Sequence, residues 1–523
     1  MNYVYKRGWD RRLNRSLPIL HILLFVLVLW GAFWLTIRHS WAASDSELDN
    51  HTTEDAQPEQ VPTADESANA TRQVIRGLLL SAPANGIGHW VIQTSDQRIH
   101  EVRVRNEKPL ADGVLPAASW VYADVQVQGH NKLFATQIRL DSYQPGEVVV
   151  RLASDSLSST IASRYDLMLN STLLTSGYIY RFSTHDPRVD VVKLVERMAS
   201  DSDIIWAELN YINSTFRGSP YRTWGWAGPE PSGYLNQEAY SQINLPAALE
   251  HYQGDGTTIA LLDTGIDLSH PALAGHWMEG YDFVSDDTEP QDEGPGLGWG
   301  HGTHIAGIIA HVAPDSKILP LRVLDTDARG DVFTLAYAIE WAVQNGADVI
   351  NLSLGAECDC ALLRETLEQA QASGVIIVAA AGNDNTNEMQ HPAIYPGVLG
   401  VTALDGRNRK AEFANYGPWV TLAAPGVGIT STIIGPQGSG YAVWSGTSIA
   451  TAFVSGAVAL TRHKLPDATT EEIRQLLTGH ARNIDSANPE HAGALGGLLD
   501  IGAAVTVDES DLPTQLYLPL VAR

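Results

Sequence analysis

Four short segments of this sequence carry side chains suited to acyl-transfer chemistry. Asp263 ends an apolar, strand-like run in Asp-Thr-Gly, and His301 stands in Gly-His-Gly-Thr-His. Ser448 stands in Gly-Thr-Ser-Ile-Ala before a long apolar run, and Asn383 ends the strand-like run Ala-Ala-Gly-Asn. A serine hydroxyl can attack a carbonyl carbon when a histidine takes its proton and a carboxylate holds that histidine. An amide side chain can donate a hydrogen bond to the oxyanion that forms.

Each segment also has an ordinary structural interpretation. Asp263 could end a turn, Ser448 could cap its helix, and Asn383 could form a turn. His304, three residues after His301, raises the alternative of a zinc-binding histidine pair. Zinc would need a third ligand and a carboxylate base, as in His-Glu-x-x-His, and the segment offers neither. We therefore expect His304 to be a buried structural histidine and the site to hold no metal.

The order of the four motifs resembles that of the subtilisin-like serine peptidases, the subtilases. The resemblance runs from about residue 242 to residue 505. It implies that Ser448 is the nucleophile, that His301 moves its proton, and that Asp263 orients the histidine. It also implies an oxyanion site made by the Asn383 side chain and the backbone N–H of Ser448.

The same resemblance implies where a polypeptide substrate binds. One wall of the primary pocket is expected at Ser353, Leu354 and Gly355. The edge to which an extended substrate adds as a strand is expected at Ala328, Arg329 and Gly330. Val332 and Leu335 could line a more distant apolar pocket or simply pack at a helix start. The residue preferred in the primary pocket stays open.

The elements that must position these residues form an α/β pattern. From about residue 237, short apolar strand-like runs alternate with helix-like runs. Such alternation predicts a subtilisin-like, doubly wound, mostly parallel sheet with helices on both faces. Asp263 would then lie at the carboxyl end of a buried strand, where open α/β sheets place their active sites.

Composition shifts divide the chain into seven expected segments. These are a signal peptide or membrane anchor (1–42), an acidic linker (43–70), a small all-β module (71–143), an α+β propeptide (145–213), a linker (214–235), the peptidase domain (236–505) and a C-terminal tail (506–523). The resemblance implies that the propeptide acts as folding chaperone and intramolecular inhibitor. Self-cleavage would then remove it, at a bond between residues 210 and 236.

The N-terminal segment predicts export. A basic stretch precedes the apolar run 17–37, and small residues at Ser40 and Ala42 suit a signal peptidase. Left uncleaved, the same run is long enough to anchor the chain in a membrane with its basic end inside. We expect a secreted protein, with anchoring to the outer face of the membrane as the alternative.

Charge and composition limit the partners. Lys plus Arg number 34 and Asp plus Glu number 60, a net charge of −26, which argues against nucleic-acid binding. The chemistry requires no cofactor. The helix after His301 runs directly into Val312, Ala313 and Pro314, without the Asn-rich calcium loop of many subtilisins. Structural calcium elsewhere stays open, for instance at the acidic run 282–293, although a solvated loop is the simpler interpretation.

The sequence leaves open whether its two cysteines are paired. Cys358 and Cys360 could form a disulfide or stay as free thiols, and they are too few for a structural zinc site.

The function expected is a secreted or surface serine endopeptidase, made as a self-processing zymogen, that hydrolyses peptide bonds through an acyl-enzyme on Ser448. The alternatives are a membrane-anchored processing protease of narrow specificity and an inactive binding protein on the same scaffold.

Overall fold

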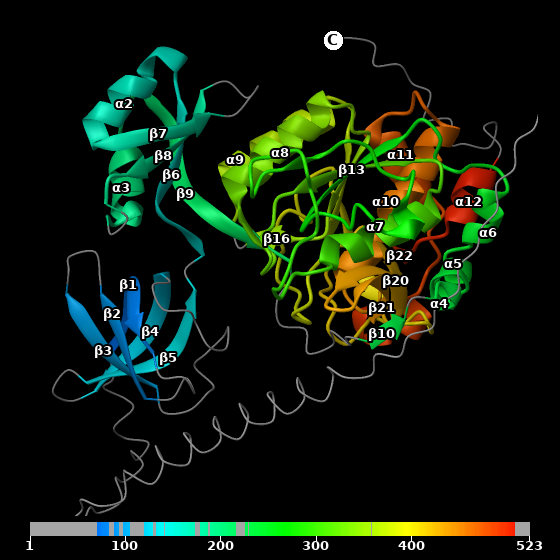
Figure 1. Cartoon of the computed structure of the whole chain (residues 1–523), viewed down its shortest axis with the longest axis horizontal. Coiled ribbons are helices and arrows are strands. Elements are labelled where there is room, and N and C mark those ends of the chain that lie inside the picture. Colours follow the sequence, from blue (N-terminus) through cyan, green and yellow to red (C-terminus); the bar gives the residue numbers. More distant parts are fainter. Residues whose placement is uncertain are drawn as a thin grey trace, which may run out of the picture. The chain divides into compact units, whose positions relative to one another are not determined.

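A computed structural model of the chain describes most residues from 71 to 507 (Figure 1). The described ranges are 71–82, 88–93, 98–104, 120–128, 132–140, 142–172, 178–186, 189–215, 225–228, 230–356 and 358–507. The expected signal or anchor (1–42), the acidic linker (43–70) and nearly all of the tail (506–523) lie outside them. No helix within these ranges is both long enough and apolar enough to cross a membrane.

The first described segment is a closed five-stranded barrel. Its strands are β1 (Thr71–Ser81), β2 (Gly88–Gln93), β3 (Ile99–Val104), β4 (Trp120–Gln128) and β5 (Lys132–Leu140). They close in the order β1-β2-β3-β5-β4, with β3 and β5 parallel and the other pairs antiparallel. Alternate residues such as Trp90, Ile92 and Val102 point inward and are fully buried. This strand order is that of the OB-type Greek-key barrel.

The next segment is an α+β unit. It comprises β6 (Tyr143–Leu152), α2 (Ser158–Tyr165), β7 (Leu167–Thr172), β8 (Ile179–Thr184), α3 (Val191–Met198) and β9 (Ile204–Ser214). The strands pair antiparallel in the order β9-β6-β8-β7, and α2 and α3 share one core with them. The sequence predicted an α+β segment over 145–213, but it did not predict α2 or β7. Hydrophobic periodicity is weak in those two elements, because Ile161 and Leu167 are their only buried residues.

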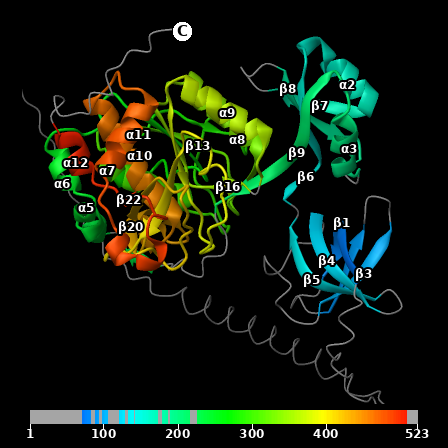
Figure 2. The ribbon, with the colours of Figure 1, turned by 180° about the vertical axis from the view of Figure 1, so that it is seen from behind.

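Strand β9 extends beyond its own unit. Its C-terminal half pairs antiparallel with β14 (Arg329–Asp331) and with β16 (Gly355–Ala356), both of which belong to the peptidase segment (Figure 2). The sheet of the α+β unit therefore takes up two short strands from a part of the chain more than a hundred residues away.

The peptidase segment is built on an eight-stranded sheet in which every neighbouring pair is parallel. In spatial order the strands are β12 (Tyr281–Asp282), β13 (Lys317–Arg322), β11 (Thr258–Asp263), β15 (Val349–Leu352), β17 (Ile376–Ala380), β18 (Leu399–Leu404), β19 (Leu422–Pro425) and β22 (Gly497–Leu498). Six of them, β13, β11, β15, β17, β18 and β19, are buried along nearly their whole length, as expected for strands covered on both faces.

Two cores lie on the two faces of this sheet. Ile259 and Leu261 face α7 (His301–Val312) and α10 (Thr447–Lys464), whereas Ala260 and Leu262 face α8 (Val332–Gln344) and α9 (Ala361–Ala372). In Figure 1, α8 and α9 lie together, apart from α7 and α10. The predicted doubly wound parallel sheet is confirmed.

The remaining elements surround this sandwich. They are α4 (Ser232–Leu235), α5 (Glu238–Gln242), α6 (Leu245–Leu249), α11 (Thr470–Gly479), α12 (Ile501–Thr506) and a three-stranded sheet of β10 (Gly225–Gly228), β21 (Gly438–Trp444) and β20 (Ile429–Gly435). Both β10 and α4 fall within 214–235, the range expected to be a linker. Residues 225–228 form a strand because their backbone pairs with β21, where Trp226 is opposite Ala442.

Candidate active site

Asp263 and His301 meet at the carboxyl edge of the sheet. Asp263 is the last residue of β11 and His301 the first residue of α7, and the Nδ1 atom of His301 lies 2.7 Å from Oδ1 of Asp263. Asp263 is fully buried and His301 is 5% exposed, so little water competes for this bond. The close approach requires a glycine after the histidine: a Cβ on Gly302 would lie 2.1 Å from the Gly265 carbonyl oxygen.

Asp292 fixes the start of the helix that carries His301. Its carboxylate accepts hydrogen bonds from the Gly300 N–H at 3.0 Å and the Thr303 N–H at 3.1 Å. It also accepts one from the Thr303 hydroxyl at 2.6 Å. Burial raises the pKa of Asp292 to about 7, against the opposing effect of these hydrogen bonds. The sequence placed Asp292 only in an acidic run, because its partners are not adjacent to it along the chain.

The rest of that acidic run is only partly solvated. Arg322, which is buried, pairs with Asp282 at 2.7 Å and with Glu293 at 2.9 Å. In the described part of the chain, no three His, Cys, Asp or Glu side chains group in a way that could hold a metal ion. Residues 313–316 alone join α7 to β13.

His304 is a structural residue, as expected. It is fully buried, its Nε2 lies 3.2 Å from the Ala442 carbonyl oxygen, and its ring stacks on Trp444 at 5.0 Å between centroids. Burial lowers the pKa of His304 to about 3, which keeps the ring neutral.

Ser448 is held at the first turn of α10. Its hydroxyl donates to the Ser353 carbonyl oxygen at 3.1 Å, and the Ser353 hydroxyl donates to the Ser448 carbonyl oxygen at 3.1 Å. The Asn351 amide donates to the Ser353 hydroxyl at 2.9 Å and accepts from Ser455 of α10 at 2.8 Å. Among the described residues, the Ser448 hydroxyl bonds to Ser353 and not to His301. Such nucleophile–base bonds often tighten only when substrate is bound.

Two donors converge beside Ser448. The Asn383 side-chain oxygen accepts from the Thr447 N–H and from the Thr447 hydroxyl, each at 3.0 Å, which orients the amide. A Cβ added to Gly446 would lie 3.8 Å from both the Asn383 Nδ2 and the Ser448 backbone nitrogen. Both donors are therefore close to one point at a helix N-terminus, where negative charge is favoured.

The predicted substrate-binding residues flank β9. Gly330 pairs with Asn213, Gly355 pairs with Ser214, and the Thr215 N–H donates to the Ala328 carbonyl oxygen at 3.2 Å. Ala328 and Gly330 on one side and Gly355 on the other thus border a single strand, and Ser353 and Leu354 directly precede Gly355. Val332 and Leu335 lie in the core shared by the sheet and α8, so the structure places them in helix packing.

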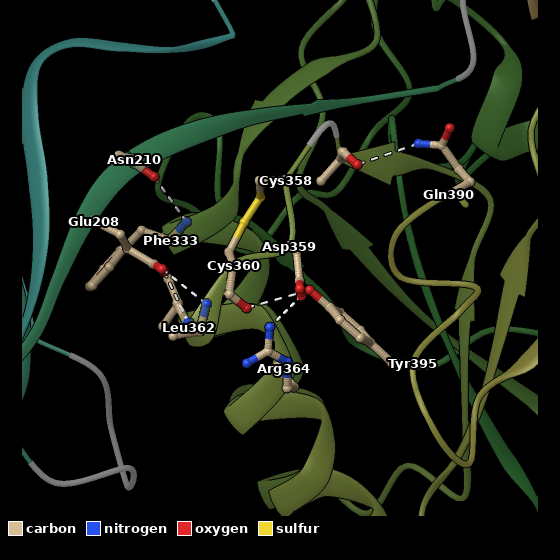
Figure 3. The surroundings of a disulfide bond; sticks show 12 residues. Glu208, Asn210, Phe333, Cys358, Asp359, Cys360, Leu362, Arg364, Gln390 and Tyr395 are labelled. Carbon is tan, nitrogen blue, oxygen red and sulfur yellow. Dashed lines mark hydrogen bonds and ion pairs between the residues drawn. A yellow bond between two sulfur atoms is a disulfide. The ribbon is translucent and has the colours of Figure 1, made fainter. Parts of the chain in front are cut away.

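Further contacts join β9 to the helices α8 and α9 (Figure 3). The Glu208 carboxylate accepts from the Ala361 N–H at 2.9 Å and the Leu362 N–H at 3.0 Å, at the start of α9. The Asn210 side-chain oxygen accepts from the Phe333 N–H of α8 at 3.1 Å. Burial raises the pKa of Glu208 to about 7, and the two backbone hydrogen bonds act in the opposite direction.

The two cysteines form a disulfide between β16 and α9. Cys358 and Cys360 are both buried, with their Cα atoms 5.2 Å apart. Between them, Asp359 pairs with Arg364 of α9, and the Tyr395 hydroxyl donates to the Cys360 carbonyl oxygen at 3.4 Å (Figure 3). This resolves the pairing that the sequence left open.

The parallel α/β fold and this set of serine, histidine and carboxylate at one edge define a serine peptidase of the subtilisin-like class. A sequence model described as "Subtilase family" matches residues 254–496. Subtilisin BL of Lederbergia lenta is 38% identical over 258 residues, which are 47% of this chain and 92% of that protein. The chain belongs to the subtilase family.

Other relatives extend the comparison. A thermophilic serine proteinase of Bacillus sp. (strain AK1) is 44% identical over 39% of this chain, and the match spans only 52% of that protein. Subtilisin NAT of Bacillus subtilis subsp. natto is 33% identical over 60% of this chain and 78% of its own length. The crystal structure of fervidolysin from Fervidobacterium pennivorans, described as a keratinolytic enzyme related to subtilisin, superimposes with a TM-score of 0.60. That superposition covers 72% of this chain and 62% of fervidolysin, at 27% identity.

Proposed function

We propose that this protein is an exported serine endopeptidase that is made as a zymogen and processes itself. The observation that carries the proposal is the Asp263–His301 pair at the sheet edge, together with β9 held as a strand between β14 and β16. A peptidase whose cleft already holds a strand of its own chain is silent until that strand is released.

The proposed roles follow from the geometry of the site. Ser448 attacks the peptide carbonyl carbon, and His301 takes the hydroxyl proton and returns it to the leaving amine. Asp263 holds the imidazole tautomer and stabilises the imidazolium that forms. Asn383 and the Ser448 N–H bind the oxyanion, and water then hydrolyses the acyl-enzyme. No step in this sequence needs a cofactor.

The α+β unit, residues 145–213 with the end of β9, is proposed as the inhibitory propeptide. Its strand β9 pairs with β14 and β16, and its Glu208 and Asn210 side chains bind the starts of α9 and α8. The same contacts would template the parallel sheet during folding, since such long-range pairing is slow to form. The peptidase itself is proposed as residues 236–505.

One experiment tests self-processing. Wild-type protein and a Ser448→Ala variant are expressed as full chains and followed by mass and by hydrolysis of casein. The wild type should lose its N-terminal part and become active, and the variant should stay intact and inactive. Equal processing of both would refute self-cleavage, and an intact, inactive wild type would favour the binding-scaffold alternative.

Export is proposed from the basic and apolar N-terminal sequence, residues 1–42. Cell fractionation separates its two forms. A product beginning near Ala43 in the medium would support the secreted form. Activity held in the membrane fraction, with residues 17–37 retained, would support the anchored processing protease instead.

A further inference from the structure

The loop that carries Asn383 follows β17 and is exposed over part of its length. Asp384 and Asn385 are exposed, and Asn383 itself is half-buried. A side-chain amide on such a loop can stabilise an oxyanion well only if the loop keeps one position while charge develops. The contacts that fix this loop therefore bear directly on the proposed oxyanion site.

Thr447 fixes the loop from the helix that carries the nucleophile. Its N–H and its hydroxyl both donate to the Asn383 side-chain oxygen at 3.0 Å. The Gly382 N–H donates to the Thr447 hydroxyl oxygen at 3.2 Å. These bonds set the direction of the amide, and none of the three involves a residue after Asn383.

The Asn415 side chain binds the backbone both before and after Asn383. Its Oδ1 atom accepts from the Asp384 N–H at 2.9 Å and from the Thr386 N–H at 3.2 Å. Its Nδ2 atom donates to the Ala381 carbonyl oxygen at 3.0 Å. Because two partners are donors and the third is an acceptor, a side-chain amide matches all three at once.

Asn415 is in turn connected to the central sheet. Its side chain is fully buried, and its N–H donates to the Gly382 carbonyl oxygen at 2.9 Å. The Thr402 hydroxyl of β18 donates to the Asn415 carbonyl oxygen at 2.6 Å. Hydrogen bonds therefore run from the sheet, through Asn415, to the peptide groups that flank Asn383.

We infer that Asn415 is a positioning residue for the peptidase reaction, which keeps the Asn383 amide where the oxyanion forms. Asn415 acts through Asn383 and not on the substrate itself. The inference rests on the oxyanion role proposed for Asn383. It goes beyond that role because it makes the strength of the oxyanion site depend on an amide from a different loop.

Steady-state kinetics of the processed enzyme test this inference. Asn415→Ala removes all three side-chain hydrogen bonds, so the loop can shift and the Asn383 amide loses its position. We expect kcat to fall about 10- to 100-fold with little change in KM, since a misplacement of about 1 Å can cost about 10²-fold. An unchanged kcat, or a change confined to KM, would overturn the inference.

Asn488 provides a matched control, because it is a buried asparagine that also makes three side-chain hydrogen bonds to backbone groups. Its Oδ1 accepts from the Lys410 N–H at 2.7 Å, and its Nδ2 donates to the Asn408 and Ile484 carbonyl oxygens at 2.9 Å. Asn488→Ala and Asn415→Ala should lower the urea midpoint of unfolding similarly. Only Asn415→Ala should lower kcat, and equal losses of kcat would overturn the inference.

A double-mutant cycle gives a readout that a purely structural role would not produce. If Asn415 acts through the Asn383 amide, adding Asn415→Ala to Asn383→Ala should lower kcat no more than about twofold further. Effects that multiply would overturn the inference but leave the oxyanion role of Asn383 intact. An unchanged kcat in Asn383→Ala alone would refute that oxyanion role and the inference with it.

A milder variant keeps the inference testable if Asn415→Ala does not fold. The hydroxyl of Asn415→Ser can still accept one of the two N–H bonds, so this variant should show a smaller fall in kcat in the same direction. Its far-ultraviolet circular dichroism should match that of the wild type. A folded Asn415→Ser enzyme with wild-type kcat, or with a fall that persists in full in the Asn383→Ala background, would overturn the inference.

Discussion

At the scale of single residues, the site depends on hydrogen bonds that fix the backbone next to the reacting groups. Ser448 and Ser353 exchange hydroxyl-to-carbonyl bonds, and Thr447 orients the Asn383 amide through two hydrogen bonds. Asp292 accepts hydrogen bonds from the first turn of α7, the turn that carries His301. Reacting groups fixed in this way need little reorganisation when charge develops.

Replacing Asn383 tests the proposed oxyanion site. Asn383→Ala should lower kcat about 10²–10³-fold with little change in KM, a magnitude measured for the comparable donor of subtilisin. Steady-state kinetics on a peptide substrate checks this result. Asn385→Ala, two residues further along the same loop, is the matched control and should retain activity. A rise in KM alone would assign Asn383 to substrate binding instead.

Replacing Asp292 tests the support of His301. Asp292→Ala leaves two buried N–H groups and a hydroxyl at the start of α7 without their acceptor. We expect a loss of roughly 2–4 kcal/mol in the free energy of unfolding, since caps and buried unpaired donors each cost about 1–3 kcal/mol. Urea unfolding of the processed enzyme measures it. The exposed Glu289→Ala is the control, and equal losses in the two variants would show that Asp292 has no special role.

The Asn213 side chain destabilises the contact between β9 and the peptidase segment. Its side chain is fully buried, and neither its Nδ2 nor its Oδ1 has a partner among the described residues. Asn213→Leu should make the cleaved propeptide bind more tightly by about 1–3 kcal/mol, the cost of leaving a polar group buried and unpaired. The inhibition constant of the propeptide fragment is the readout. Weaker binding would show that leucine does not fit this position.

At the scale of elements, β9 connects the two functional parts of the chain. One strand pairs with β6 in its own unit and with β14 and β16 of the peptidase segment. The strand also reaches α9 through Glu208 and through Trp206, whose Nε1 donates to Glu365 at 3.0 Å. The inhibition proposed above would therefore depend on this one strand.

The raised pKa of Glu208 predicts pH-dependent release of the propeptide. In the free fragment this side chain should have its ordinary pKa near 4.3, and in the complex burial raises the pKa to about 7. Binding therefore takes up a proton between these values, so affinity falls as pH rises toward about 7.

The rate at which the cleaved fragment leaves the processed complex measures this effect. Release should accelerate between about pH 5 and pH 7, with affinity changing by at most about tenfold per pH unit. Glu208→Gln should flatten the dependence, whereas the exposed Glu196→Gln on α3 should preserve it. An unchanged pH profile in Glu208→Gln would exclude Glu208 as the titrating group.

At the scale of the whole molecule, the barrel has a separate core, whereas Val149 and Ile179 of the α+β unit pack into the peptidase core on the α8 and α9 side of the sheet. The barrel β1–β5 encloses its own core around Trp90 and Val102, and the α+β unit has another around Phe182 and Leu194. The peptidase sheet has one core on each face. Units with separate cores can fold on their own.

Deleting the barrel tests this independence. A chain without residues 71–140 should process and hydrolyse substrate within about twofold of the full chain. Leu194→Asp, which puts a charge into the core of the α+β unit, is the contrast and should abolish processing. Processing followed on a gel gives the comparison. Failure of the barrel deletion alone would assign the barrel a part in folding or activation.

The sequence by itself determined the family, the α/β class and the residues suited to the chemistry. These signals are local: Asp263, His301, Asn383 and Ser448 each stand in a short motif, and Gly302 marks a close approach to the Gly265 carbonyl group. The alternation of strand-like and helix-like runs predicts the parallel sheet, and this pattern too is visible in short stretches of the sequence. Elements with little buried surface, such as α2 and β7, gave no such signal.

Only the tertiary structure decided which distant residues meet. The sequence left three contacts or bonds unpredicted or open: Asp292 with the start of α7, Glu208 of β9 with the start of α9, and the Cys358–Cys360 disulfide. The register of Ser214 against Gly355 brings together segments more than a hundred residues apart. Strand register is set by the packing of both partners at once, so no local pattern in either segment contains it.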